Sequence, residues 1–184
     1  MFFTNAVAAG ILALATASPL ASQVGSNGFN ATQMEDFKKE MIMGHSWYRK
    51  QHSASEVIWS DEVASAAQDW ANQCSMSHKG NNKYGENLAW GSLKNWAHPQ
   101  NMWGSERTKY NWANPGFSGA TGHFTQMVWK KSTHLGCGVK KCSNTNTYVV
   151  CQYDPKGNIM GGSNFKDNVG AQVEGKIDDV WPGP

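Results

Sequence analysis

Two histidines and two glutamates, drawn from four separate segments, are the residues of this sequence that could together do chemistry. Neutral imidazole nitrogens and carboxylate oxygens are both ligands that zinc accepts, so the four side chains could bind a divalent cation if the fold brings them together. They could equally form a metal-free ion network with shifted protonation. Both interpretations stay open at this stage. The four residues are His78, Glu86, Glu106 and His123.

Glu86 lies in a segment that predicts a short strand, residues 84–91, with glycines near both ends. The surrounding pattern is that of a buried strand, and an unpaired buried carboxylate is energetically expensive. We therefore expect Glu86 to be paired or hydrogen-bonded. His78 comes shortly before it, in a polar loop over residues 75–83.

Glu106 and His123 are each predicted to lie on a helix. In a helix predicted over residues 99–111, Met102, Glu106 and Tyr110 are spaced four residues apart, which puts Glu106 in the apolar stripe. A loop rich in Gly, Pro and Asn then leads to the short amphipathic helix that carries His123.

Two longer helices precede these segments and a strand pair follows them. Residues 32–35 have the form of a capping box and start the first helix, and Ser60 is the predicted N-cap of the second. Residues 135–141 and 147–153 are predicted to pair as an antiparallel hairpin, because β-branched and aromatic residues favour strands. Helices interleaved with a small, largely antiparallel sheet indicate a layered α+β domain.

The size and charge of the chain limit its class. Its 184 residues suit one domain with some tail and are enough to bury a hydrophobic core. The formal net charge is +2, and no run of Lys and Arg is long enough to follow a phosphate backbone, which argues against a nucleic-acid partner.

The N-terminal sequence predicts export from the cell. Residues 1–21 have the apolar run and small-residue cleavage site of a secretory signal peptide, and this run is far shorter than the ~20 residues of a membrane span. Residues 22–31 are predicted to be a flexible leader, residues 32–162 the folded domain and residues 163–184 a tail that wraps or hangs. In an exported chain, Asn30 of the sequon Asn-Ala-Thr becomes a candidate glycosylation site.

Four cysteines in an exported chain predict two disulfide bonds, with three possible connectivities. Cys137 and Cys142 lie five residues apart on one predicted strand, so their side chains face opposite ways and pair poorly with each other. If the turn between the strands has an odd residue count, Cys137 comes opposite Cys151, which leaves Cys74 for Cys142. A zinc site that uses Cys74 and His78 with the Cys137 and Cys142 pair has a loosely similar spacing, but it suits an oxidising compartment less well.

Four motifs occur in a fixed order along the chain. They are Tyr-Gly-Glu-Asn-Leu-Ala-Trp-Gly at residues 84–91, Gly-His-Phe-Thr-Gln-Met-Val-Trp at 122–129, Leu-Gly-Cys-Gly at 135–138 and Cys-Gln-Tyr-Asp-Pro-Lys-Gly-Asn at 151–158. On these motifs the sequence resembles the CAP superfamily, which contains the cysteine-rich secretory proteins, antigen 5 and the pathogenesis-related 1 proteins. The resemblance covers residues 34–162.

The resemblance implies a fold and a site. The fold is a three-layer α-β-α sandwich of the α+β class, with a small, mainly antiparallel central sheet. The site is the family's cavity tetrad, in which a divalent ion such as zinc or magnesium can bind. The tetrad maps onto His78, Glu86, Glu106 and His123.

The resemblance also suggests one disulfide connectivity, which agrees with the strand argument above. The two bonds would be Cys74–Cys142 and Cys137–Cys151. One departure lies near the cavity, where pathogenesis-related 1 proteins usually have another cysteine pair and this chain has the loop 114–119 instead.

The function that the resemblance implies is binding. Similar family members bind sterols, fatty acids or other hydrophobic ligands, and they act in host–microbe interaction or defence. Such ligands need a concave apolar site. Aromatic residues predicted to line it are Tyr84, Trp90, Trp96 and Trp103.

Two other functions compete with the binding protein. In a secreted hydrolase, Glu86 and Glu106 could act as general acid and base, or the cluster could hold a zinc ion that activates water. The sequence lacks the His-Glu-x-x-His and Gly-x-Ser-x-Gly motifs, and its cysteines are assigned to disulfides, so no separate nucleophile is evident. A protein-interaction module is the third possibility, and the residues indicate no particular partner.

Overall fold

The computed structural model describes residues 23–184. The predicted signal peptide therefore lies outside the described residues. Within that part of the chain, no helix has the length and hydrophobicity to cross a membrane.

A four-stranded sheet forms the middle layer of the molecule, in the order β1-β3-β4-β2. The hairpin β3 (His134–Lys141) and β4 (Thr147–Asp154) is its centre, as the sequence predicted. β2 (Gly85–Gly91) pairs antiparallel with β4, and the two-residue β1 (Ile58–Trp59) runs parallel to β3. β2 is therefore an edge strand, and Glu86 lies near its start.

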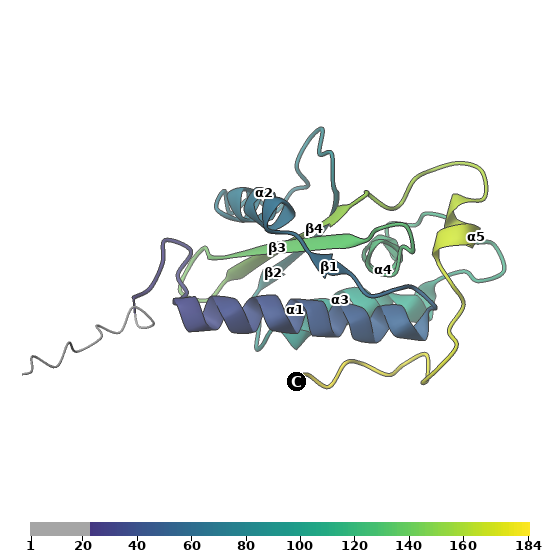
Figure 1. The fold of residues 1–184 in the computed structure, drawn as a ribbon, viewed down its shortest axis with the longest axis horizontal. Coiled ribbons are helices and arrows are strands. Elements are labelled where there is room, and N and C mark those ends of the chain that lie inside the picture. The colour runs from purple at the N-terminus through teal and green to yellow at the C-terminus, as the bar shows by residue number, and fades with distance from the viewer. Residues whose placement is uncertain (1–22) are drawn as a thin grey trace, which may run out of the picture.

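Helices cover both faces of the sheet, which gives the expected α-β-α sandwich (Figure 1). α2 (Asp61–Ala71) lies on one face, while α1 (Ala31–Gln51) and α3 (Ala97–Gly104) lie on the other. α2 approaches β3 closely because Gly136 and Gly138 face it, and a Cβ atom at either glycine would collide with the α2 backbone.

The helix that carries Glu106 differs from the prediction of one continuous helix. α3 ends at Gly104, and a 3-10 helix, η2 (Ser105–Lys109), follows. Trp103, near the end of α3, is buried and lies three residues before Glu106, a spacing that puts two helical residues on neighbouring parts of one face. Met102, which the fourfold spacing placed in the apolar stripe, is instead 47% exposed.

The first helix also begins at a different residue. Its N-cap is Asn30, whose side chain accepts a hydrogen bond from the Gln33 amide while the Gln33 side chain accepts one from the Asn30 amide. The capping box is therefore shifted by two residues from the predicted start at Thr32. The short helix with His123, α4 (Gly122–Met127), is as predicted and packs against β2 and α3.

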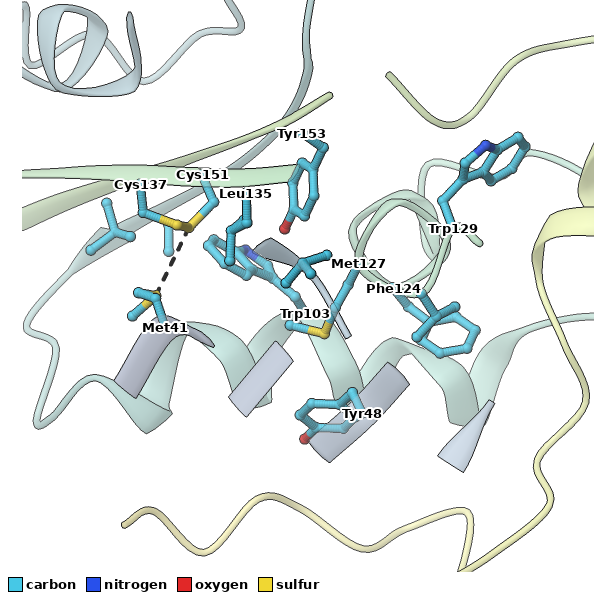
Figure 2. Close-up of a cluster of buried hydrophobic side chains, with 14 of the residues drawn as sticks. Met41, Tyr48, Trp103, Phe124, Met127, Trp129, Leu135, Cys137, Cys151 and Tyr153 are labelled. Atoms are coloured by element: carbon cyan, nitrogen blue, oxygen red, sulfur yellow. Dashed lines mark hydrogen bonds between the residues drawn. A yellow bond between two sulfur atoms is a disulfide. The ribbon is translucent and has the colours of Figure 1, made fainter. Parts of the chain in front are cut away.

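The main core fills the space between the sheet and the α1–α3 layer (Figure 2). Both disulfides suggested by the resemblance are present, Cys74–Cys142 and Cys137–Cys151. Cys137 and Cys151 are paired residues of β3 and β4, because the connecting turn has five residues. In Figure 2, Cys151 Sγ lies 3.9 Å from Met41 Sδ of α1, so this disulfide is part of the core.

Residues of the predicted leader and of the predicted tail pack on the domain. Phe29 is buried against Trp96, with ring centroids 5.3 Å apart. At the other end, α5 (Asn164–Asn168) buries Phe165, and the residues after it wrap along α1, where Trp181 is buried.

We call residues 170–184 the C-terminal strap. The buried Arg107 holds the strap to the domain through hydrogen bonds. Its guanidinium donates hydrogen bonds to the backbone carbonyls of Lys176, Ile177 and Asp179. It also donates to Gln51 Oε1 of α1 at 2.8 Å. The predicted tail is thus an ordered part of the molecule.

Candidate functional site

A cleft of about 410 Å³ lies beside the start of β2, between the loop before that strand and α4. Its walls carry three of the four predicted tetrad residues, and Glu106 stands directly behind His123. The cleft, as we use the word below, is lined by His78, Lys79, Asn82, Tyr84, Glu86, Asn87, Phe117, Gly119, Gly122, His123, Gln126 and Asn158.

His78 and Glu86 form the first of two imidazole–carboxylate pairs. His78 Nδ1 lies 2.8 Å from Glu86 Oε1, and the His78 side chain is 62% exposed while that of Glu86 is only 5% exposed. Glu86 also accepts hydrogen bonds from the Lys79 amide, Asn82 Nδ2 and Gln152 Nε2. The predicted need for partners at this carboxylate is therefore met at both oxygens.

His123 and Glu106 form the second pair, with Nδ1 and Oε1 2.7 Å apart. The other oxygen of Glu106 accepts hydrogen bonds from the backbone amides of His123 and Phe124, so this carboxylate also anchors the first turn of α4. Trp103 supports the pair from behind, because its ring is stacked on the His123 ring at 6.4 Å between centroids.

The carboxylates decide which imidazole nitrogen carries the proton. A carboxylate oxygen facing Nδ1 can only accept, so Nδ1 of His78 and of His123 donates. In the neutral imidazole this leaves Nε2 as an acceptor. The hydrogen bond with Glu86 also raises the pKa of His78, and burial opposes this effect only in part.

The resemblance implies that the two imidazoles are ligands for a divalent ion. Each imidazole is oriented by a carboxylate on its other nitrogen, which is the arrangement that commonly surrounds zinc-bound histidines. Within residues 23–184, no group of three or more His, Cys, Asp or Glu side chains is arranged to hold a metal. An ion held by these two imidazoles alone would keep its other coordination positions for solvent or ligand.

The four aromatic residues predicted to line an apolar site are not brought together. Tyr84 does line the cleft. Trp90 packs against Tyr148 below α2, Trp96 packs near the N-terminal turn, and Trp103 is buried behind His123. The reason is geometrical. Trp90 lies four residues beyond Glu86 along β2, while Trp103 belongs to α3 and Trp96 is its N-cap, in the helix layer that contains α1.

Phe117 is an apolar lining residue of the cleft that the sequence did not predict, and it is 51% exposed. Asn158, which also lines the cleft, donates to the Gly122 carbonyl at 2.8 Å. Ile159 and Met160 follow Asn158 in the chain and are 38% and 67% exposed. A large apolar residue in a loop is the signal that could have identified Phe117.

Comparisons with known proteins agree with this fold. A family model described as the cysteine-rich secretory protein family, CAP, matches residues 44–153. Pathogenesis-related protein 1 of Arabidopsis thaliana is 38% identical over 134 residues, which cover 70% of this chain and 83% of that protein. Secreted protein RBT4 of Candida albicans is 39% identical over 149 residues, 76% of this chain, but the match spans only 40% of that longer relative.

A solved structure is similar as well. The crystal structure described as NaASP2 with Zn²⁺ superposes with a TM-score of 0.63 at 25% sequence identity. The match covers 76% of this chain and 87% of that one.

Proposed function

The chain belongs to the CAP family of cysteine-rich secretory proteins, and from this premise we propose that it binds a hydrophobic ligand at the cleft, next to a divalent ion held by its two imidazoles. The protein is extracellular and related to defence proteins, and its two disulfides suit that setting. The ligand class we propose is a sterol or fatty acid, and the biological setting is host–microbe interaction or defence.

One observation carries the proposal: both imidazoles and the apolar ring of Phe117 line the same cleft. A cleft of about 410 Å³ falls within the range of ligand sites, which combine apolar walls with a few placed polar groups. A bound zinc or magnesium ion would supply positive charge next to the ligand. His78 Nε2 and His123 Nε2 would hold it, and the two carboxylates keep those rings in place.

The hydrolase alternative has less support from the geometry. A general acid or base must reach the proton that it transfers. Both oxygens of Glu86 and both oxygens of Glu106 already accept hydrogen bonds from the protein. Their observed role is to orient imidazoles and backbone amides.

A ligand-transfer assay tests the binding proposal. Purified protein is incubated with donor vesicles that carry a labelled sterol or a labelled fatty acid, with and without zinc. We expect saturable extraction of one ligand, and we expect Phe117→Ser to weaken it about tenfold, because burying this ring contributes about 1.5–3 kcal/mol. Met102→Ser is the matched control, since Met102 is exposed to a similar degree and does not line the cleft.

Two results would contradict the proposal. One is that both ligands stay in the vesicles whether or not zinc is added. The other is that Phe117→Ser and Met102→Ser affect extraction equally, because the cleft would then have no special role.

A further inference from the structure

A second cavity, of about 440 Å³, lies between the N-terminal turn and the helices α1 and α2, and we call it the N-terminal cavity. Its walls include residues 23–27, Asn30 and Met34 at the start of α1, and Gln68 and Asn72 near the end of α2. None of the residues that line it is charged. The volume falls within the range of sites for small organic ligands. The uncharged lining favours a neutral ligand.

Asn30 gives this cavity a covalent link to one kind of ligand. It is the asparagine of the sequon Asn-Ala-Thr, and it lines the cavity. Its Oδ1 accepts a hydrogen bond from the Gln33 amide at 2.9 Å, which leaves Nδ2, the atom that carries a glycan. Transfer from a lipid-linked pyrophosphate donor forms the bond between Nδ2 and the sugar C1, breaks the bond between C1 and the pyrophosphate oxygen, and releases one amide proton. The cap oxygen takes no part in this reaction, so the N-cap of α1 is kept.

The walls of the N-terminal cavity combine apolar surface with amide groups that the protein uses only in part. Val24 is 66% exposed, and Met34 Sδ accepts a hydrogen bond from Asn27 Nδ2 at 3.0 Å. Asn72 Oδ1 accepts from Gln68 Nε2 at 2.9 Å, which leaves Asn72 Nδ2 as a donor. A sugar ring has apolar C–H faces and hydroxyl groups that both donate and accept, so it matches both kinds of wall.

We infer that the N-terminal cavity is the docking site of the first N-acetylglucosamine of a glycan on Asn30. Because the sugar is attached to a residue of the cavity wall, it binds within the same molecule and needs little intrinsic affinity. The turn beside it is short: the Gly25 amide donates to the Phe29 carbonyl at 2.8 Å, and the Gly28 amide donates to the Gly25 carbonyl at 2.9 Å. Terminal segments of this kind open easily. A docked sugar bridges the turn to α1 and α2, so it slows this opening.

The test is amide hydrogen exchange of the protein secreted from a eukaryotic host, in three forms. They are the wild type, the wild type trimmed by an endoglycosidase to a single N-acetylglucosamine, and Thr32→Ala. Thr32 is exposed, so this substitution abolishes the sequon but keeps Asn30 and its cap. We expect the Gly25 and Gly28 amides to exchange about 2- to 10-fold more slowly in both glycosylated forms than in Thr32→Ala, the effect of one net hydrogen bond. The Thr121 amide, which donates to the Ser118 carbonyl in another turn, is the control and should exchange at one rate in all three forms.

A second measurement locates the sugar on the protein. The side-chain amide resonances of Asn72 should differ between the single-sugar form and Thr32→Ala, whereas those of Gln73, which is exposed and does not line the cavity, should not. The inference is wrong if the single-sugar form exchanges as fast as Thr32→Ala, since any protection would then come from the bulk of the complete glycan. It is also wrong if the Asn72 resonances do not change, or if the wild-type chain carries no glycan.

Discussion

At the scale of single residues, the site depends on two carboxylates that orient imidazole rings. Glu86 is nearly buried yet accepts four hydrogen bonds, from one imidazole, one backbone amide and two side-chain amides. This number of donors explains how a charge can lie under a strand edge without destabilising the fold. It also holds His78, a largely exposed ring, in one orientation.

The first prediction concerns the protonation of His78. Because the hydrogen bond to Glu86 is the main cause of the raised pKa of His78, Glu86→Gln should bring that pKa back toward its ordinary value. NMR titration of the His78 ring protons measures it. Glu62→Gln is the control, since Glu62 is an exposed glutamate that bonds Lys83 and Tyr84.

The raised pKa of His78 also decides how fold stability and zinc affinity should change with pH. The His78–Glu86 bond stabilises the fold fully below the ordinary imidazole pKa, and this stabilisation is lost as the pH rises through the higher pKa of the folded state. Zinc needs the neutral ring, so zinc affinity should fall on acidification from a higher pH in wild type than in Glu86→Gln. An unchanged His78 titration in Glu86→Gln would contradict this account.

At the scale of elements, local patterns predicted what local physics determines. The hairpin, β2 and α4 were all identified, because strand propensity, bounding glycines and helical spacing act within a few residues. The face that Glu106 occupies was also predicted, but for a partly wrong reason. Trp103 is buried three residues before Glu106, whereas Met102, four residues before it, is 47% exposed.

The residues of the cleft also divide into those that could be predicted and those that depend on distant segments. His78, Glu86 and His123 were predicted to meet because a family resemblance supplied the tertiary information. The hydrogen bonds of Asn87 were not predicted, since its Nδ2 donates to Tyr153 Oη and to the His123 carbonyl, which belong to other elements. No pattern along the chain records such a relationship.

The N-terminus of α1 gives a prediction at this scale. Asn30 is both the helix N-cap and the asparagine of the sequon, and its Oδ1 serves as the cap acceptor, which leaves Nδ2 for a glycan. On expression in a eukaryotic secretory system, we expect mass spectrometry to find a glycan at Asn30. Asn30→Asp and Thr32→Ala should both lose it.

Stability separates the two roles of Asn30. Asn30→Ala should lower the free energy of unfolding by about 0.5–2 kcal/mol in a urea titration, because it removes the cap. Asn30→Asp keeps an acceptor oxygen and should have a much smaller effect. Equal losses of stability in Asn30→Ala and Asn30→Asp would contradict the role of Asn30 as a cap. A wild-type chain without a glycan would contradict its role as a glycosylation site.

At the scale of the whole molecule, the C-terminal strap joins the two helices of one layer. Trp181 is buried, and its amide and carbonyl exchange two hydrogen bonds with the Asn101 side chain of α3. Val173 donates to the Gln51 carbonyl at the end of α1. The strap therefore acts as a brace across α1 and α3, on the layer that also buries Trp103 behind the cleft.

The prediction for this scale is a large loss of stability from one residue near the chain end. Trp181→Ala should lower the free energy of unfolding by about 3 kcal/mol, since truncation of a buried tryptophan leaves a cavity. Val180→Ala is the control, because Val180 is 49% exposed and should change stability by no more than about 0.5 kcal/mol. Chemical denaturation of both variants measures the difference, and similar midpoints would show that the strap contributes little.

The carbonyl groups around Arg107 have a practical consequence for anyone who expresses the protein. The family model ends at residue 153, whereas the acceptors of this guanidinium lie at residues 176, 177 and 179. A gene truncated at the family boundary would lack these acceptors and would expose Arg107 and the surface that Trp181 covers. Recombinant versions should therefore retain the chain through Trp181.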